Sequence, residues 1–298
     1  MSEIRESINE VKVEGILSEN GLVIGTYSKD NVEKEVIRGE IKVKVVQEIN
    51  GKETPLEVSV NYFVPKITSK GKPSQAYTSL LEAYNKMKSI ASVGEEEATR
   101  VSIPKARLVM NEFYDKRGEL VSQPRINGSF CNIIDKAKCK PEATFKVSMY
   151  VGKDCKDEVD AEGELTGRYL LKGAIAQWGG RLDIVPFVVA NPNAIDYIKD
   201  NWAPNQTVNA TGRLNFGVIS EDVAVQSDFG ETLIEPRTRQ VRELIITGGS
   251  NPMDGDFAMN PEAIQEALKE RTARLEELKK KAAEKEPEVK GNYSNLGF

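Results

Sequence analysis

The stretch GEIKVKVVQEINGKETPLEVSVNYFV, residues 39–64, contains the clearest strand signal in this chain. Apolar and polar residues alternate from Ile41 to Val45, and they alternate again from Leu56 to Val60. A period of two residues is typical of a strand with one buried face. The Asn50-Gly51 step between the two runs is a hairpin turn signal. The stretch therefore predicts two antiparallel strands joined by a tight turn.

The rest of the first half contains three further strand patterns and one helix pattern. VKVEGIL (11–17) alternates as a strand does, and TSLLEAYNKMKSIA (78–91) has apolar residues at helical spacing. Further strands are predicted at 99–114 and near 124–134. The segment PKITSKGKPSQ (65–75) is predicted to be a basic loop, mobile until a ligand binds. The order is therefore strand, strand, strand, helix, strand, strand.

The second half repeats this order with different residues. The predicted strands are 144–152, 167–178, 181–190, 204–219 and 239–249. A helix is predicted at 193–202, between the third and fourth of these strands, with Asn193 as its candidate N-cap. The repeat is one of element order, because the two halves share few residues.

The OB-fold is a five-stranded Greek-key barrel of this kind. The expected fold is therefore mainly β with short helices, built as two tandem OB-type five-stranded barrels plus a C-terminal helix. NEVKVEGIL (9–17) and Gly212-Arg213-Leu214 carry a further resemblance. They are similar to the first and fourth strands of bacterial and bacteriophage single-stranded DNA-binding proteins. This resemblance, over roughly 9–249, implies a protein that binds single-stranded DNA in replication or recombination.

The expected divisions are a first barrel at 1–136, a second barrel at 137–249, a linker at 250–260, a helix at 261–286 and a flexible tail at 287–298. The tail has little apolar content with which to fold. Members of the resembled family recruit replication partners through an acidic tail, and this tail is not acidic. Recruitment of replication or recombination proteins through the helix or tail is an expectation, as is homo-oligomer formation through the helix.

Composition favours binding over catalysis. The chain of 298 residues has no histidine, which excludes a histidine general base or a Ser-His pair. No phosphate-binding loop or nucleophile-elbow motif occurs. Three scattered cysteines without a C-x-x-C favour neither a zinc site nor a disulfide framework. We therefore expect no enzyme activity, no cofactor and no metal, and a cytoplasmic protein without a membrane span.

The net charge is −5, yet between Tyr62 and Ile134 basic residues outnumber acidic ones by four. A basic groove can coexist with an acidic exterior. Single strands are bound by cations that contact phosphates and by aromatic side chains that stack on bases. The candidates in the first barrel are Tyr62, Phe63, Lys66, Lys70, Lys72, Tyr77, Lys105, Arg107, Phe113, Tyr114, Lys116, Arg117 and Arg125. The candidates in the second barrel are Tyr169, Lys172, Trp178, Arg181, Arg213 and Phe216.

Three functional hypotheses stay open. The first is a sequence-independent single-stranded DNA-binding protein that coats and protects unwound strands, with RNA as an alternative ligand. The second is a phage structural or assembly protein built on OB-like barrels. The third is a metal-dependent nuclease that uses carboxylates, although Glu95–Glu97 is more simply a solvated loop. The basic loop 65–75 favours the first hypothesis, because a structural protein does not need it.

Overall fold

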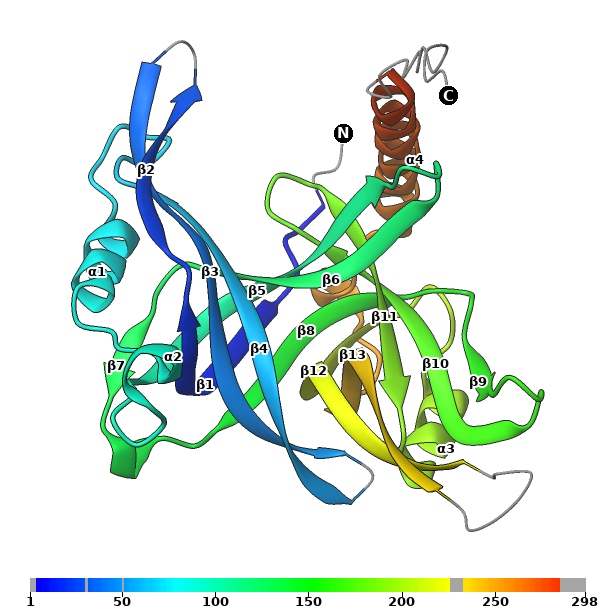
Figure 1. Cartoon of the computed structure of the whole chain (residues 1–298). Coiled ribbons are helices and arrows are strands. Elements are labelled where there is room, and N and C mark those ends of the chain that lie inside the picture. The colour runs from blue at the N-terminus through cyan, green and yellow to red at the C-terminus, as the bar shows by residue number, and fades with distance from the viewer. Residues whose placement is uncertain (1–3, 30–31, 50, 226–232, 285–298) are drawn as a thin grey trace, which may run out of the picture.

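A computed structural model describes residues 4–29, 32–49, 51–225 and 233–284 (Figure 1). The strands are β1 (Asn9–Asn20), β2 (Val23–Lys29), β3 (Val32–Ile49), β4 (Lys52–Pro65), β5 (Arg100–Tyr114), β6 (Leu120–Gly128), β7 (Asn132–Ile134), β8 (Glu142–Val151), β9 (Lys156–Val159), β10 (Leu165–Ala176), β11 (Leu182–Val189), β12 (Thr207–Val225) and β13 (Leu233–Gly249). The α-helices are α1 (Gln75–Tyr84), α2 (Ile90–Val93), α3 (Pro192–Asn201) and α4 (Pro261–Glu284). Short 3-10 turns lie at Lys136–Lys138 and Gly255–Phe257.

Hydrogen bonding between strands closes two rings of five strands each. In the first ring, β1 pairs with β3, β3 with β4, β4 with β6, β6 with β5, and β5 with β1. In the second ring, β8 pairs with β10, β10 with β11, β11 with β13, β13 with β12, and β12 with β8. The pairing of the third and fifth strands is parallel in both rings, and the other pairings are antiparallel. The two halves therefore share one topology.

The two rings are continuous with each other. Their first strands, β1 and β8, pair antiparallel from Asn9–Val147 to Glu14–Glu142, so strands of both rings belong to one 13-stranded sheet. One apolar cluster also runs through both, and it includes Val11 of β1 and Phe145 of β8. The prediction of a mainly β fold with short helices and a C-terminal helix is confirmed. The rings are not two independent barrels, because they share the β1–β8 pairing, and the predicted domain limits stay predictions.

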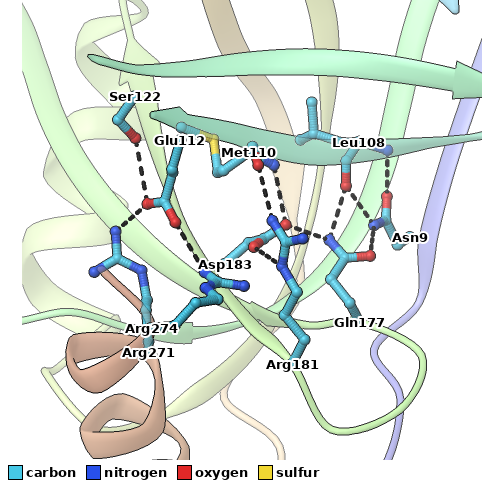
Figure 2. Close-up of polar contacts among 10 residues, drawn as sticks. All are labelled: Asn9, Leu108, Met110, Glu112, Ser122, Gln177, Arg181, Asp183, Arg271 and Arg274. Atoms are coloured by element: carbon cyan, nitrogen blue, oxygen red, sulfur yellow. Dashed lines mark hydrogen bonds and ion pairs between the residues drawn. The ribbon is translucent and has the colours of Figure 1, made fainter. Parts of the chain in front are cut away.

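A buried polar network also ties the rings together (Figure 2). Asp183 of the second ring is fully buried and accepts a hydrogen bond from the backbone N–H of Met110 of the first ring, at 2.9 Å. Arg181 Nε lies 3.0 Å from the other oxygen of Asp183, and Gln177 Nε2 donates to the Leu108 carbonyl at 2.9 Å. Because Asp183 and Gln177 are buried away from water, they depend on partners in the first ring, while the partly exposed Arg181 also donates to the Met110 carbonyl at 2.9 Å.

Helix α4 lies against both rings. Ile264 and Ala267 of α4 are buried against Ala174 and Leu182 of the second ring. From the same helix, Arg271 and Arg274 bind the buried carboxylate of Glu112 on β5, with 2.8 Å between Arg274 Nη2 and Glu112 Oε2. The predicted C-terminal helix is thus confirmed, and its first half is part of the packed body. The predicted tail at 287–298 lies outside the described residues.

Several predicted boundaries are wrong. The single helix at 78–91 is two helices, because Asn85 ends α1 and Ser89 begins α2. Such side chains favour helix ends over helix interiors. The N-cap of α3 is Asn191, whose side chain accepts from the Ala194 N–H at 3.2 Å, instead of Asn193. Proline at the first helical position suits this start, because it has no N–H to satisfy.

Two strands were not predicted, and one predicted strand is divided. β2 has little buried surface and β9 has four residues, so neither shows a strong alternation. The predicted strand at 124–134 is divided into β6 and β7. No helix within the described residues is long and apolar enough to cross a membrane.

Candidate nucleic-acid interface

The outer face of β3 and β4 is polar, although its inner face is part of the core. Alternation sends Val43 and Val58 inward, where both are fully buried. Directly opposite residues on paired strands share a face, so the outer face is built from four cross-strand pairs. These pairs are Arg38–Phe63, Glu40–Asn61, Lys42–Ser59 and Lys44–Glu57. The face therefore carries three cations, two carboxylates, one aromatic ring and two uncharged hydrogen-bonding side chains.

A groove of about 780 Å³ lies over part of this face. Its floor includes Lys42, Lys44, Ser59 and Asn61. One wall comes from β5 and β6 of the first ring and the other from β12 and β13 of the second ring, so both halves of the chain contribute to it. Phe113, Arg125, Phe216, Val218 and Arg242 are among the wall residues.

The groove cations differ in how strongly they are engaged. Lys42 Nζ lies 2.8 Å from Glu19, and hydrogen bonding to that carboxylate raises the pKa of the lysine. Lys44 lies 2.7 Å from Glu95. Among the described side chains, Arg125 forms no ion pair, and it is exposed. Exposed ion pairs are worth about 0–1 kcal/mol, so a phosphate can replace the carboxylate partners of the two lysines at small cost.

Two phenylalanines offer ring faces or edges on this side. Phe63 is 55% exposed and makes an edge contact with Tyr27 of β2, with 5.1 Å between ring centroids. Phe113 lines the groove and is 43% exposed. A half-exposed phenylalanine next to cations suits base stacking, because part of its ring surface is accessible to a base.

The corresponding face of the second ring is partly covered by α4. β10 and β11 occupy the places in the second ring that β3 and β4 occupy in the first. Ile175 and Phe187 point into the main core. Ala174, Ala176 and Leu182 instead form a separate apolar cluster with α4. Helix α4 therefore covers one end of this face, while the Lys172–Pro186 pair farther along it stays exposed.

Comparisons with known proteins agree with this architecture. A family model described as YorF matches residues 7–281. The chain belongs to the YorF family. A comparison with curated proteins finds no match. The crystal structure of the wild-type single-stranded DNA binding protein from Thermus aquaticus is similar, with a TM-score of 0.51 and 8% sequence identity over 84% of this chain and 96% of that chain.

A deletion mutant of that Thermus aquaticus protein matches with a TM-score of 0.49 and 10% identity, over 88% of this chain and all of the other. Sequence identities of 8% and 10% support a similarity of fold and nothing more. The YorF-family chain therefore has an OB-like fold, as the strand order of its two rings indicates.

Several predicted aromatic contacts of this YorF-family chain are core residues. Tyr62 and Tyr77 are buried, and their hydroxyls donate to the Phe130 carbonyl and to Glu35. Burial raises the pKa of Tyr77 to about 12, and the Glu35 carboxylate adds to this rise. Phe216 is buried at the groove wall. These three rings cannot stack on a base without leaving the core, so their prediction as stacking residues is corrected.

The other predicted aromatics are accessible to different degrees. Phe113 is exposed and the adjacent Tyr114 is half-buried. Tyr169 is half-buried, with Lys199 Nζ 5.1 Å from its ring centroid. Trp178 is 78% exposed, next to the Gly179-Gly180 turn of the β10–β11 hairpin. It does not line the groove over the first ring.

The predicted cations are spread over the surface. Arg125 is the only one of them in the main groove, while Lys105 and Arg213 line a second groove. Lys70, Lys72 and Lys116 are exposed. The others are paired with carboxylates: Lys66 with Glu35, Arg107 with Glu6, Arg117 with Asp115, Lys172 with Asp154 and Arg181 with Asp183. Arg181 is part of the network between the rings, so its role in the structure is architectural.

Sequence reasoning missed several residues of the open face. Arg38, Lys42, Lys44 and Tyr27 were not among the candidates. Two of these, Lys42 and Lys44, are the polar members of the alternation that predicted the hairpin, so the pattern itself contained their signal. The contribution of Arg242 had no local signal, because β13 reaches the first ring only through the tertiary fold.

Proposed function

We propose that this chain is a sequence-independent single-stranded DNA-binding protein whose ligand lies across the outer face of β3 and β4. It would coat unwound strands during replication or recombination. The observation that carries the proposal is the open groove of about 780 Å³, which Phe113 and Arg125 line, together with the exposed Arg38–Phe63 pair on the same outer face of β3 and β4. Cations suit phosphates and phenylalanine rings suit bases of any sequence.

The architecture supports the same placement. We propose that each ring is an OB-type barrel, in which β3–β4 and β10–β11 are the second and third strands. This is the face on which OB-folds bind oligonucleotides. In the second ring α4 covers one end of the equivalent face, so the first ring would carry the main site.

The contacts would act without reading sequence. Arg38 and Arg125 would neutralise phosphates, and Phe63 and Phe113 would stack on unpaired bases. A duplex keeps its bases stacked inside, so only a single strand can use these rings. Binding without catalysis, a cytoplasmic location, and association with further copies or replication proteins through α4 remain predictions.

A salt-titrated fluorescence anisotropy assay tests the proposal. Labelled oligothymidylate, oligouridylate and duplex DNA are compared for the parent, for Arg38→Ala/Arg125→Ala and for the control Lys279→Ala/Lys280→Ala on α4. We expect tight binding to the single strand and weak binding to duplex. The arginine variant loses two phosphate contacts, and each contributes about 0.7 to the salt slope of single-strand binding, so its slope should be lower by about 1.4. Equal affinity for duplex, or equal slopes in all three proteins, would refute the proposal, and stronger binding to oligouridylate would identify RNA as the ligand.

A further inference from the structure

A second groove, of about 500 Å³, lies where the two rings join. Its residues come from β1 and β8, which form the joint, and from β5, β12 and β13. It shares no lining residue with the main groove. We call it the seam groove.

The lining of the seam groove is strongly cationic. Four basic side chains, Lys12, Lys105, Lys146 and Arg213, line it with a single acidic one, Glu10. The hydroxyl groups of Thr144, Thr211 and Thr247 complete a polar rim. Lysine ammonium groups and threonine hydroxyls are the donors that proteins use on phosphate oxygens.

Two of these cations are neutralised by carboxylates, and two are not. Lys12 Nζ lies 2.9 Å from Glu142, and Arg213 Nη1 lies 3.4 Å from Glu48. Lys105 and Lys146 form no ion pair within the described part of the chain. Glu10 is opposite Lys146 in the β1–β8 register, yet the two side chains are not within ion-pair distance. The groove therefore keeps positive charge available for a ligand.

The backbone presents Lys105 in an unusual way. Its φ angle is +60°, in a β-bulge of β5 between Ile103 and Ala106. A side chain in this left-handed conformation costs on the order of 1 kcal/mol, which glycine would avoid. Bulges redirect side chains, and this one places an exposed lysine at the seam groove. The strain is explained if the ammonium group has a ligand.

We infer that the seam groove binds the phosphate backbone of a single strand, as a second contact surface outside the main groove. This inference rests on the proposed function. A short strand would fill only the β3–β4 face, while a longer one would also reach Lys105 and Lys146. The joint between the rings would then extend the footprint beyond one barrel without adding sequence preference.

The test uses Lys105→Gly/Lys146→Ala, because glycine removes the charge and relieves the strained backbone at the bulge. Thermal unfolding should show that this variant is at least as stable as Lys105→Ala/Lys146→Ala. Anisotropy is measured with oligothymidylates of about 8 and about 40 nucleotides, chosen around the usual site size of one OB-fold. The control is Lys279→Ala/Lys280→Ala, which removes the same charge from α4.

Each lost phosphate contact lowers the salt slope by about 0.7, so with the longer strand we expect the slope to fall by about 1.4. At 0.1 M salt this change corresponds to a loss of affinity of about 25-fold. With the shorter strand, and for the control with both strands, affinity should stay within about twofold of the parent. Parent-like affinity of the double variant for both lengths would overturn the inference and leave the proposed function intact. Failure of the parent to bind either length would overturn the proposed function.

Discussion

Replacing Asp183 with alanine should strongly destabilise the protein. The Asp183 carboxylate is fully buried and accepts from Met110 N at 2.9 Å, Gln177 Nε2 at 3.2 Å and Arg181 Nε at 3.0 Å. Its removal leaves the first two donors buried without this acceptor, at about 1–3 kcal/mol each. Arg181 stays partly solvated and adds less. We expect a loss of about 3–5 kcal/mol, most of it from the two buried donors that lose this acceptor.

Urea unfolding followed by circular dichroism measures this loss, with Asp183→Asn and Asp154→Ala as comparisons. Asparagine preserves the volume and one acceptor, so it should lose about half as much. Asp154 is 76% exposed in its pair with Lys172, so its removal should change stability by less than about 1 kcal/mol. A loss below about 1 kcal/mol for Asp183→Ala would refute the claim that this network holds the rings together.

Three further predictions concern the binding face, the basic loop and the thiols. Phe63→Ala should weaken oligothymidylate binding by about 1–3 kcal/mol with an unchanged salt slope, because stacking is lost and no charge is removed. Anisotropy measures the affinity and the salt slope, and an unchanged affinity would contradict stacking. Changing Lys66, Lys70 and Lys72 to alanine should lower the salt slope of single-strand binding by about 0.7 per lost contact, equally for all DNA sequences. Stability should change little, and an unchanged salt slope would show that the segment is only a linker. Burial raises the pKa of Cys131 to about 12, so a thiol reagent at pH 8 should label Cys139 and Cys155 first. Peptide mass spectrometry measures the order of labelling, and early labelling of Cys131 would contradict its burial.

Alternation along the strands allowed much of the fold to be predicted. Residues 39–49 and 52–64 do form the paired strands β3 and β4, because their apolar residues fill one face only, and Asn50 of the predicted turn lies outside the described residues. The same rule separates Tyr62 from Phe63. Tyr62 shares its parity with the buried Val58 and Val60, so its burial could have been read from the pattern.

Contacts between distant segments could not be predicted in this way. β2 lacks an alternating apolar pattern, because most of its side chains are exposed. The Met110 partner of Asp183 lies on β5 and the arginine partners of Glu112 lie on α4, so the local sequence contains no sign of these contacts. The seam groove likewise depends on the pairing of β1 with β8, which element order alone does not specify.

The loop at 65–75 shows a related limit. The structure folds it into a small hairpin, with Ile67 bridged to Pro73 and the Ser74 N–H bonded to the Lys66 carbonyl at 2.9 Å. Composition predicted an exposed basic segment, and Lys70 and Lys72 are indeed exposed. Its closure over a ligand stays a prediction.

Hydrogen–deuterium exchange of the free and oligothymidylate-bound protein tests the central claim most directly. Peptides covering β3, β4 and the groove strands β5 and β6 should exchange more slowly when the strand is bound, because the ligand covers their outer face. Peptides from β10 and β11 under α4 should be unchanged. Protection confined to β10–β11, or no protection of β3–β4 at saturating oligonucleotide, would contradict the placement of the binding site on the first ring.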